Sequence, residues 1–441
     1  MSSKNITGNH SSFKVKPGGV ISGRLTVPGD KSISHRALML GAIAEGETTI
    51  TGFLQGEDTL ATARVFQQMG VEIENNGSLV KVKGVGLHGL HAYDKALDFG
   101  NSGTSVRLMS GLLSAQAFDS ELIGDESLMT RPMMRVINPL RTMNAVINCT
   151  DKGTLPINIS GGNQLTAIDY ELPVASAQLK SCLLLAGLYA EGTTRITENK
   201  TTRDHTERML GAFSHPVTKN GSKISIEKAE RLVATEISVP ADFSSSAFFI
   251  VAASICPGSD VVLENVGINP TRDAMLKIMD LMGADIELEN AREQSSEPVA
   301  DIHIKSSELT GIDIPEELVP IAIDEFPAIL IAAACAKGTT RLSGAAELRV
   351  KESDRIEAML DGFIATGIKV EATDDGMIIE NGEFQGGVVN SHGDHRIAMA
   401  FAVAGMVAKD PVVIKDCENV ATSFPGFVEL AQKAGMDINY E

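Results

Sequence analysis

The feature that most constrains the fold is a pattern that recurs six times along the chain: a helix that often ends at glycine, followed by a short alternating strand. In the first copy the helix covers 57–70 and the strand 71–74, and apolar residues recur along one face of the helix. Gly70 suits the end because many helices finish in a left-handed residue. Similar copies cover 273–287, 354–370 and 425–438, and weaker copies without the glycine cover 136–147 and 204–217.

These copies indicate units of alternating strands and helices. Three of them follow a glycine turn that leads into a β-branched strand, at 45–50, 191–196 and 337–342. The copies recur at intervals of roughly 70 to 80 residues, which suits a βαβαββ unit rather than a solenoid step. Six units divide as three plus three, with a break near 239–241. A coincidental α/β protein with similar helix ends is the alternative interpretation.

Length and composition limit the class of protein. A chain of 441 residues is too long for one ordinary core, so we expect two or three domains. With 43% hydrophobic and 22% charged residues it reads as globular, and no apolar run reaches the roughly 18 residues of a membrane span. The polar segment 1–12 predicts a disordered tail rather than a secretory signal.

Net charge and cysteine content indicate which classes of binding partner are unfavourable and in which cellular compartment the protein is expected. A net charge of −19 argues against nucleic acid and anionic membranes as partners. The five scattered cysteines fit buried thiols in a reducing compartment, so we expect a cytoplasmic protein.

Several loops combine a basic residue with small or hydroxyl neighbours. Small residues let backbone amides approach an anion, lysine supplies a point charge, and arginine supplies a two-pronged donor for phosphate or carboxylate. Because such loops occur in both halves of an acidic chain, we infer a ligand with several negative charges held between the halves. The loops cover 28–36, 100–107, 131–135, 176–180, 202–205, 349–355 and 394–396.

Two apparent nucleotide-binding motifs fail on inspection. Residues 29–32 resemble the end of a P-loop, but Asp30 separates the glycine from the lysine, and no upstream glycine has the required spacing. Residues 84–89 match GxGxxG, but no amphipathic helix follows them. The histidines show no ligand spacing, so we expect neither a metal nor a cofactor.

Taken together, the loops at 28–36, 100–104, 131–133, 349–355 and 394–396 closely resemble those of 5-enolpyruvylshikimate-3-phosphate (EPSP) synthases, in the order of that family. The resemblance covers nearly the whole chain from about Phe13. It looks most like the bacterial branch with Ser-Ala-Gln in the middle motif, here 176–178.

The resemblance implies an α/β fold with two similar globular domains. Each would contain three βαβαββ units around a pseudo-threefold axis, an arrangement known as an inside-out α/β barrel. The first domain would cover 28–240, and the second would cover 241–441 and be completed by segment 13–27. Hinges would lie near Pro28 and Pro240.

The implied reaction transfers the enolpyruvyl group of phosphoenolpyruvate to the 5-hydroxyl of shikimate-3-phosphate and releases phosphate, in the shikimate pathway to chorismate and aromatic amino acids. The residues expected to bind shikimate-3-phosphate are Lys31, Ser32, Arg36, Ser176, Ala177, Gln178, Arg203, Asp324 and Lys351. Those expected to bind phosphoenolpyruvate are Lys31, Asn101, Gly103, Arg131, Gln178, Arg355 and Arg396.

The resemblance also implies the catalytic residues Asp324, Glu352 and Lys31. The chemistry needs one group to accept the hydroxyl proton and another to protonate carbon, after which both roles reverse. We assign Asp324 to the hydroxyl and Glu352 to carbon, with Lys31 and the arginines stabilising charge on the phosphate.

One position departs from the family and another bears on an inhibitor. Thr422 stands where many members have a lysine that contacts phosphoenolpyruvate, so we place no site residue there. Gly103 accompanies sensitivity to glyphosate in the family, which makes glyphosate an expected inhibitor. We also expect a monomer.

Two alternative functions remain. The sister enzyme that transfers enolpyruvyl to UDP-N-acetylglucosamine usually carries a cysteine shortly before an Arg-Pro pair, and residues 124–130 contain none. A non-catalytic anion-binding protein or repeat scaffold is disfavoured because Lys31, Asp324, Lys351 and Glu352 are all present.

Overall fold

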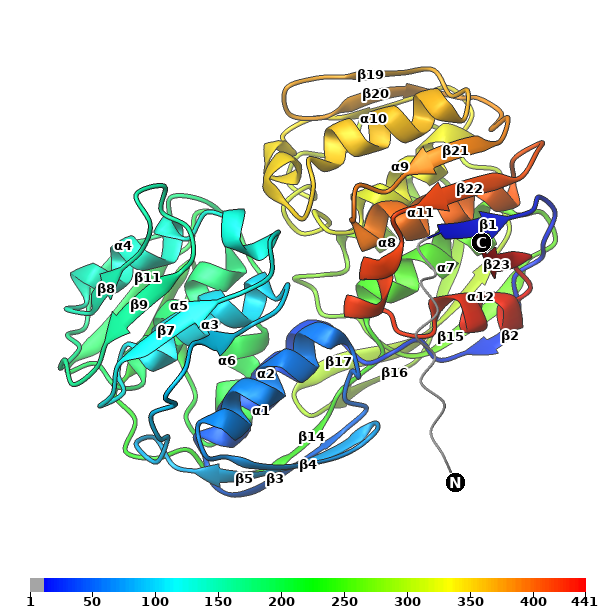
Figure 1. The fold of residues 1–441 in the computed structure, drawn as a ribbon. Helices are drawn as coiled ribbons and strands as arrows, with labels where there is room; N and C mark the ends of the chain where they lie inside the picture. The colour runs from blue at the N-terminus through cyan, green and yellow to red at the C-terminus, as the bar shows by residue number, and fades with distance from the viewer. Residues whose placement is uncertain (1–11) are drawn as a thin grey trace.

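A computed structural model describes residues 12–441, which form two lobes side by side (Figure 1). Within this range the strands form six small sheets. In five of them one parallel strand pair is followed by two antiparallel strands. The sixth, β18-β20-β19, has only isolated parallel bridges, such as Asp313 to Arg341, in place of the fourth strand.

The first lobe holds three of these units. One comprises α1 (Lys31–Ala42), β3 (Glu45–Thr51), α2 (Glu57–Gln68), β4 (Glu72–Asn76), β5 (Leu79–Val85) and β14 (Glu236–Ser238). Another comprises β6 (Leu97–Asp98), α3 (Gly103–Leu113), β7 (Ser120–Ile123), α4 (Met134–Thr142), β8 (Val146–Asn148) and β9 (Ile157–Ser160). The third comprises β10 (Asp169–Glu171), α5 (Ala177–Gly187), β11 (Thr193–Thr197), α6 (His205–Ala212), β12 (Thr218–Asn220) and β13 (Lys223–Glu227).

The second lobe repeats this plan. Its first unit comprises β2 (Ser22–Leu25), α7 (Phe243–Ile255), β15 (Asp260–Gly267), α8 (Ala274–Leu281), β16 (Asp285–Gln294) and β17 (Glu297–Lys305). The next comprises α9 (Phe326–Cys335), β18 (Thr339–Leu342), α10 (Arg355–Ala365), β19 (Val370–Ala372) and β20 (Met377–Glu380). The last comprises β21 (Gly387–Asn390), α11 (His395–Met406), β22 (Val412–Lys415), α12 (Phe427–Ala434), β23 (Ile438–Tyr440) and β1 (Ser12–Val15). Short 3₁₀ helices are η1 (Leu128–Thr130), η2 (Ala346–Val350) and η3 (Glu418–Thr422).

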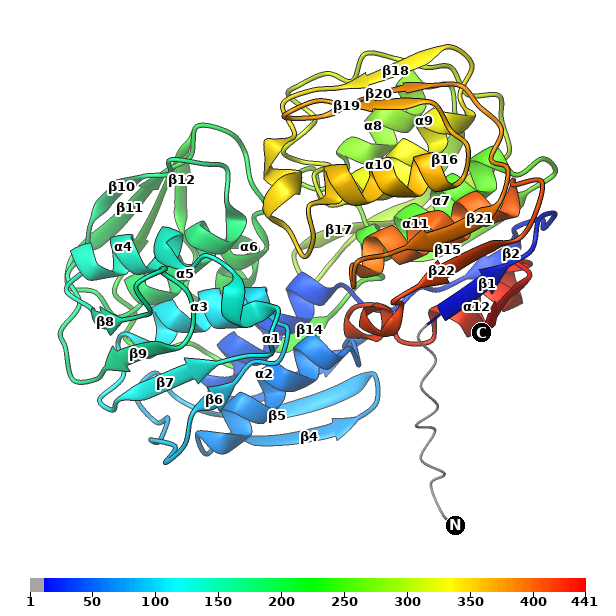
Figure 2. The same ribbon diagram turned by 45° about the horizontal axis from the view of Figure 1, so that its top comes forward.

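The first helix of each unit lies inside its lobe, and the sheets lie outside (Figure 2). In the second lobe α7, α9 and α11 contact one another, and in the first lobe α3 contacts both α1 and α5. Helices α7 and α9 are almost entirely apolar or small around their circumference, and their side chains are buried. A helix without a polar face is stable only when its neighbours cover it on all sides, so these sequences place the helices at the centre.

The two weaker sequence copies have the same helix ends as the other four. Each second helix is followed by a residue with positive φ, which is glycine at 70, 283, 367 and 435. After α4 and α6 the corresponding residues are Asn144 (φ 74°) and Ser214 (φ 66°). A left-handed backbone does not require glycine, although other residues are less favourable there.

The chain crosses between the lobes at two adjacent segments. The amide of Asp30 donates to the carbonyl of Pro240 at 2.8 Å, and the amide of Asp242 donates to the carbonyl of Pro28 at 2.9 Å. Gly29 lies at this crossing, where a Cβ atom would come 1.9 Å from the carbonyl oxygen of Gly52. Only glycine fits such a close backbone approach.

Buried apolar residues form two separate cores. One collects residues between Ile33 and Val239, and the other combines 13–27 with residues from Ala241 to Ile438. Strands β1 and β2 pair with strands of the second lobe, whereas β14 pairs with β3 of the first.

Some sequence expectations concern the ends and the surface of the chain. Most of the tail predicted at 1–12 lies outside the described residues, but Ser12 begins β1 and pairs with Lys415. The five cysteines are free, and Cys182, Cys256 and Cys417 are buried. Within 12–441, no helix has the length and hydrophobicity needed to cross a membrane.

Candidate active site

A cavity of about 540 Å³ lies between the two lobes and is lined by residues of both. Helices α1, α3, α5, α7 and α11 begin at or within one residue of the lining, and α9 begins two residues after the lining residue Asp324. Helix N-termini carry free amides and partial positive charge. The backbone alone therefore makes this cavity favourable for anions.

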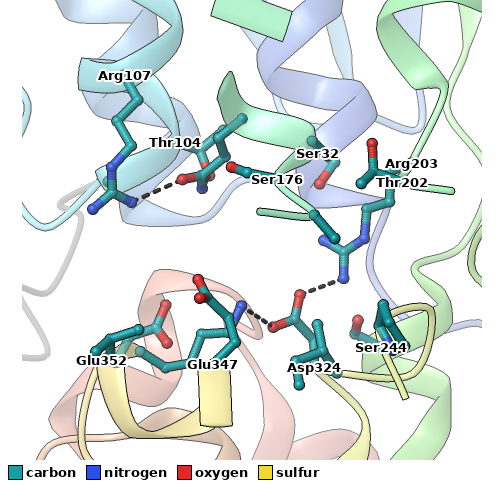
Figure 3. Close-up of a pocket in the computed structure, with 18 of the residues that line it drawn as sticks. Ser32, Thr104, Arg107, Ser176, Thr202, Arg203, Ser244, Asp324, Glu347 and Glu352 are labelled. Carbon is teal, nitrogen blue, oxygen red and sulfur yellow. Dashed lines mark hydrogen bonds and ion pairs between the residues drawn. The ribbon is translucent and has the colours of Figure 1, made fainter. Parts of the chain in front are cut away.

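Figure 3 shows the two walls facing each other. Ser32, Thr104, Arg107, Ser176, Thr202 and Arg203 come from the first lobe, and Ser244, Asp324, Glu347 and Glu352 come from the second. The structure brings all but two of the predicted site residues to this lining. Those on it are Lys31, Ser32, Asn101, Gly103, Arg131, Ser176, Ala177, Gln178, Arg203, Asp324, Lys351, Glu352 and Arg396.

The two predicted residues that are not on the lining, Arg36 and Arg355, are buried directly behind it. Arg36 donates to the carbonyl oxygen of Ser32 at 3.0 Å and to the hydroxyls of Ser181 and Thr206, each at 2.7 Å. The three guanidinium nitrogens thus donate within α1 and to α5 and α6. The motif predicted a residue type that suits anions, but it did not predict the direction of the side chain.

Arg355 is in the corresponding position behind Glu352. Its Nη2 lies 2.6 Å from Glu352 Oε2, and its Nε lies 2.8 Å from Asp394 Oδ2. The side chain of Arg355 is only 1% exposed, so here it orients a carboxylate of the lining instead of facing the cavity.

Asp324 is surrounded by cationic side chains from both lobes. It forms an ion pair with Arg203, and its Oδ1 lies 3.4 Å from both Lys351 Nζ and Arg355 Nη1. Arg396 donates to its backbone carbonyl at 2.8 Å. Burial acts to raise the pKa of Asp324, but these cations outweigh it and hold the pKa well below its ordinary value.

Glu352 has a similar electrostatic environment. Burial acts to raise its pKa, whereas Arg355 above all, then His395 and Arg131, hold the pKa well below the ordinary value. His395 itself is buried, and its pKa falls to about 3, mainly through loss of solvation and the nearby Lys31. Both carboxylates are therefore ionised beside a cluster of cations.

Lys31 is the first residue of α1 and is fixed at both its backbone and its side chain. Its Nζ lies 2.8 Å from Asp58 Oδ2, and its backbone amide donates to Asp242 at 3.0 Å. The preceding residue, Asp30, caps α1 and pairs with buried Arg272 at 3.2 Å. The ammonium is thereby held at the point where the lobes meet.

A hydrogen-bonded row forms the wall between α3 and α5. Gln178 accepts from Arg107 Nη1 at 2.8 Å and donates to Thr104 Oγ1 at 3.0 Å. Arg131 donates to Asn101 Oδ1 at 2.7 Å. Burial, together with the nearby Arg135 and Arg131, lowers the pKa of Arg107 to about 10.

Sequence reasoning gave no role to several lining residues. Arg107 and Arg135 lie within the loops 100–107 and 131–135, and Glu347 lies just before the loop 349–355. Arg135 Nη1 and Glu347 Oε1 are 3.0 Å apart, which makes a further ion pair between the lobes. Glu347 is recognised as a site residue only through this contact, because the two segments are far apart in the chain and no motif links them.

Away from the cavity, three side chains lie close enough together to bind a metal ion, an arrangement that the sequence did not show. Single ligand atoms of Glu287, Glu289 and His303, on the β16–β17 pair, lie within 4.8 Å of one another. Both nitrogens of His303 already contact carboxylates, Asp260 at 2.7 Å and Glu289 at 3.2 Å. We assign no metal to this group.

Comparison with known proteins gives consistent results. Residues 15–430 match the family described as EPSP synthase (3-phosphoshikimate 1-carboxyvinyltransferase). The 3-phosphoshikimate 1-carboxyvinyltransferase of Methylococcus capsulatus is 59% identical over 97% of this chain and 98% of its own, and that of Legionella pneumophila is 58% identical over 95% and 97%. The solved structure of EPSP synthase from Acinetobacter baumannii superposes with a TM-score of 0.88 at 56% identity, covering 97% of this chain and 99% of that one. This match confirms the predicted two-domain α/β fold class.

Proposed function

The chain belongs to the EPSP synthase family, and we propose which of its residues carry out that family's reaction. It transfers the enolpyruvyl group of phosphoenolpyruvate to the 5-hydroxyl of shikimate-3-phosphate and releases phosphate, a step of aromatic amino acid biosynthesis. The observation that supports the assignment of residues is the pair of ionised carboxylates, Asp324 and Glu352, on a cavity where six helix N-termini converge.

Shikimate-3-phosphate is assigned mainly to the first lobe. Ser176, Ala177 and Gln178 at the start of α5 offer amide and side-chain donors to its phosphate, and Ser32 does so from α1. Arg203 and Lys31 supply positive charge from the same lobe, and Lys351 supplies it from the other. Arg36 acts through Ser32, whose carbonyl it binds.

Phosphoenolpyruvate is assigned to the arginines at the junction of the lobes. Arg131, held by Asn101, and Arg396, held on the backbone of Asp324, provide donors from opposite walls. Lys31 and Gln178 complete the set, and Gly103 leaves room beside Arg131. Arg355 contributes by holding Glu352.

The proton transfers are assigned to Asp324 and Glu352. Asp324 accepts the proton of the 5-hydroxyl as that oxygen attacks C2, and Glu352, which takes up a proton when the anionic substrates bind, delivers that proton to C3. In the second step Glu352 takes a proton back from the C3 methyl group as the bond between C2 and the phosphate oxygen breaks, and Asp324 gives its proton to the departing phosphate. Bound phosphate and carboxylate groups offset the surrounding cations, which raises the carboxylate pKa values toward the range that proton transfer needs.

The domain division is proposed at the two crossing segments. One domain covers 28–240, and the other covers 241–441 together with 13–27. The separate cores and the hydrogen bonds between Pro28–Asp30 and Pro240–Asp242 support hinges at these points.

Three further properties are proposed. Glyphosate competes with phosphoenolpyruvate, the protein is a monomer, and it acts in the cytoplasm. Competition kinetics, ultracentrifugation and cell fractionation test them in turn.

A phosphate-release assay tests the assignments. We expect release with shikimate-3-phosphate and none with UDP-N-acetylglucosamine as the acceptor. Glu352→Gln keeps the size of the side chain but cannot carry the proton, so kcat should fall by ~10²–10⁴-fold. Near-normal turnover in this variant would remove Glu352 from the mechanism.

A further inference from the structure

Lys180 is a buried lysine that the proposed mechanism does not use. It lies on α5, and its side chain is 0% exposed. Its Nζ is 3.0 Å from Glu198 Oε2, 2.7 Å from Glu207 Oε1 and 3.2 Å from the carbonyl oxygen of Thr202. A buried ammonium is costly unless such partners compensate it, so this cluster is a specific construction and not a chance contact.

The two carboxylates around Lys180 differ in what else they contact. Glu198 Oε2 also accepts hydrogen bonds from the hydroxyl of Thr202 at 2.9 Å and from its amide at 3.3 Å. Glu207 lies on α6, and within 12–441 its oxygens have no hydrogen-bond partner besides their contact with the ammonium. Of the two carboxylates, only Glu198 therefore joins the lysine to the loop at 199–203, which Lys180 also contacts directly at the carbonyl oxygen of Thr202.

That loop is part of the cavity wall. Asn199, Lys200, Thr202 and Arg203 all line the cavity. Lys180 stands one helical turn after Ser176, which caps α5 at the same cavity. The contacts from Lys180 through Glu198 to Thr202 thus connect the start of α5 with the 199–203 loop, which are both assigned to shikimate-3-phosphate.

We propose that Glu198, held by Lys180, is a positioning residue that fixes the 199–203 loop and so presents Arg203 to shikimate-3-phosphate. Glu198 borders the cavity, but its side chain is only 3% exposed and its Oε2 is already engaged by Lys180 and Thr202, so it acts through the loop rather than on the substrate. A loop that is already ordered loses less conformational entropy when the ligand binds, which strengthens binding. This inference rests on the proposed assignment of Arg203.

The two carboxylates provide a matched experiment. Glu198→Gln and Glu207→Gln each remove one negative charge from the same buried ammonium. We expect Glu198→Gln to raise KM and Kd for shikimate-3-phosphate by about 3- to 10-fold, the range of a lost hydrogen bond or two, and to leave KM for phosphoenolpyruvate within about 2-fold. Glu207→Gln should leave both KM values within about 2-fold.

A second variant covers the case in which Glu198→Gln does not fold. Glu198→Asp keeps the charge but shortens the side chain, which weakens the contacts of its carboxylate with both Lys180 and Thr202, so it should also raise KM for shikimate-3-phosphate. If the folded Glu198 and Glu207 variants have equal KM values, the cluster is merely structural and the proposal fails. An equal loss for both substrates in a Glu198 variant also overturns it.

The variant Arg203→Gln distinguishes a failure of the positioning role of Glu198 from a failure of the assignment of Arg203 to shikimate-3-phosphate. If Arg203→Gln weakens shikimate-3-phosphate and the Glu198 variants do not, only the positioning role is wrong. If Arg203→Gln leaves KM for shikimate-3-phosphate unchanged, the assignment of Arg203 is itself wrong, and the positioning role falls with it.

Discussion

Arg203 of the first lobe and Asp324 of the second form an ion pair across the cavity (Figure 3). Against the effect of burial, Lys351 and then Arg203 hold the pKa of Asp324 well below its ordinary value, so the carboxylate is ionised. A phosphate that binds Arg203 competes with Asp324 for the guanidinium. Substrate binding therefore releases Asp324 from one of its cations and makes it a stronger base.

Asp324→Asn should reduce turnover far more than binding. The amide cannot accept the hydroxyl proton, so we expect kcat to fall by ~10²–10⁴-fold while Kd for shikimate-3-phosphate changes much less. Glu347→Gln is the matched control, because Glu347 also lines the cavity and pairs with an arginine across it. Steady-state kinetics with titration calorimetry distinguish the two, and similar losses in both variants would contradict a specific role for Asp324.

Gly103→Ala should discriminate between glyphosate and phosphoenolpyruvate. The added Cβ would lie 3.2 Å from Arg131 Nη1 and 3.3 Å from Arg107 Nη1, so these two lining guanidiniums must shift slightly. Overpacking of this kind costs about 1–3 kcal/mol, and the longer ligand should be affected more. We expect the inhibition constant for glyphosate to rise by a larger factor than KM for phosphoenolpyruvate. Equal factors would mean that the methyl disturbs the loop alone.

Buried histidines should make the protein less stable as pH falls from 7 to 5. Burial, with Lys31 and Arg36 nearby, holds the pKa of His35 well below 6.5, and His395 titrates at about 3. In this window the unfolded chain binds protons that the folded chain does not, so the free energy of unfolding falls with pH. The slope is at most about 1.4 kcal/mol per pH unit for each histidine.

Denaturant unfolding at pH 7, 6 and 5 measures this slope. His35→Gln should flatten it. His303→Gln should steepen it, because hydrogen bonding to Asp260 raises the pKa of His303, and that contribution to stability is gained as pH falls. A slope that His35→Gln leaves unchanged would contradict the burial of His35 in its neutral form.

Gly29→Ala should destabilise the protein at the crossing between the lobes. The new Cβ would come 1.9 Å from the carbonyl oxygen of Gly52, so backbone must move, at a cost of about 1–3 kcal/mol or more. Gly211→Ala is the control, because a Cβ there meets nothing within 4 Å and the residue lies in helix α6. Calorimetry should show a lower Tm for the first variant and an equal or higher Tm for the second.

The sequence predicted local structure better than long-range pairing. The helix ends at Gly70, Gly283, Gly367 and Gly435 were predictable because a left-handed cap favours glycine. The same ends at Asn144 and Ser214 gave only a weak signal, since these residues adopt that conformation less readily.

Long-range relationships have no such local signal. Nothing in the residues of β14 shows that they pair with β3, because the two strands are far apart in the chain. Motifs identified Arg36 and Arg355 as residue types suited to anions, but whether a side chain faces the cavity or lies behind it depends on the packing of neighbouring helices. For the same reason, the ion pair of Arg135 with Glu347 became evident only in three dimensions.

The pairing of β1 sets an order of events on the ribosome. This strand precedes the whole of 28–240 in the chain, yet its partners β22 and β23 follow nearly all of the second lobe. The segment 28–240 contains every strand of its own sheets, including β14, so it can fold while translation continues, as N-terminal domains generally do. The other lobe must wait for β22 and β23, and until they are synthesised β1 remains without partners and available to chaperones, whereas β2 can pair with β15 much earlier.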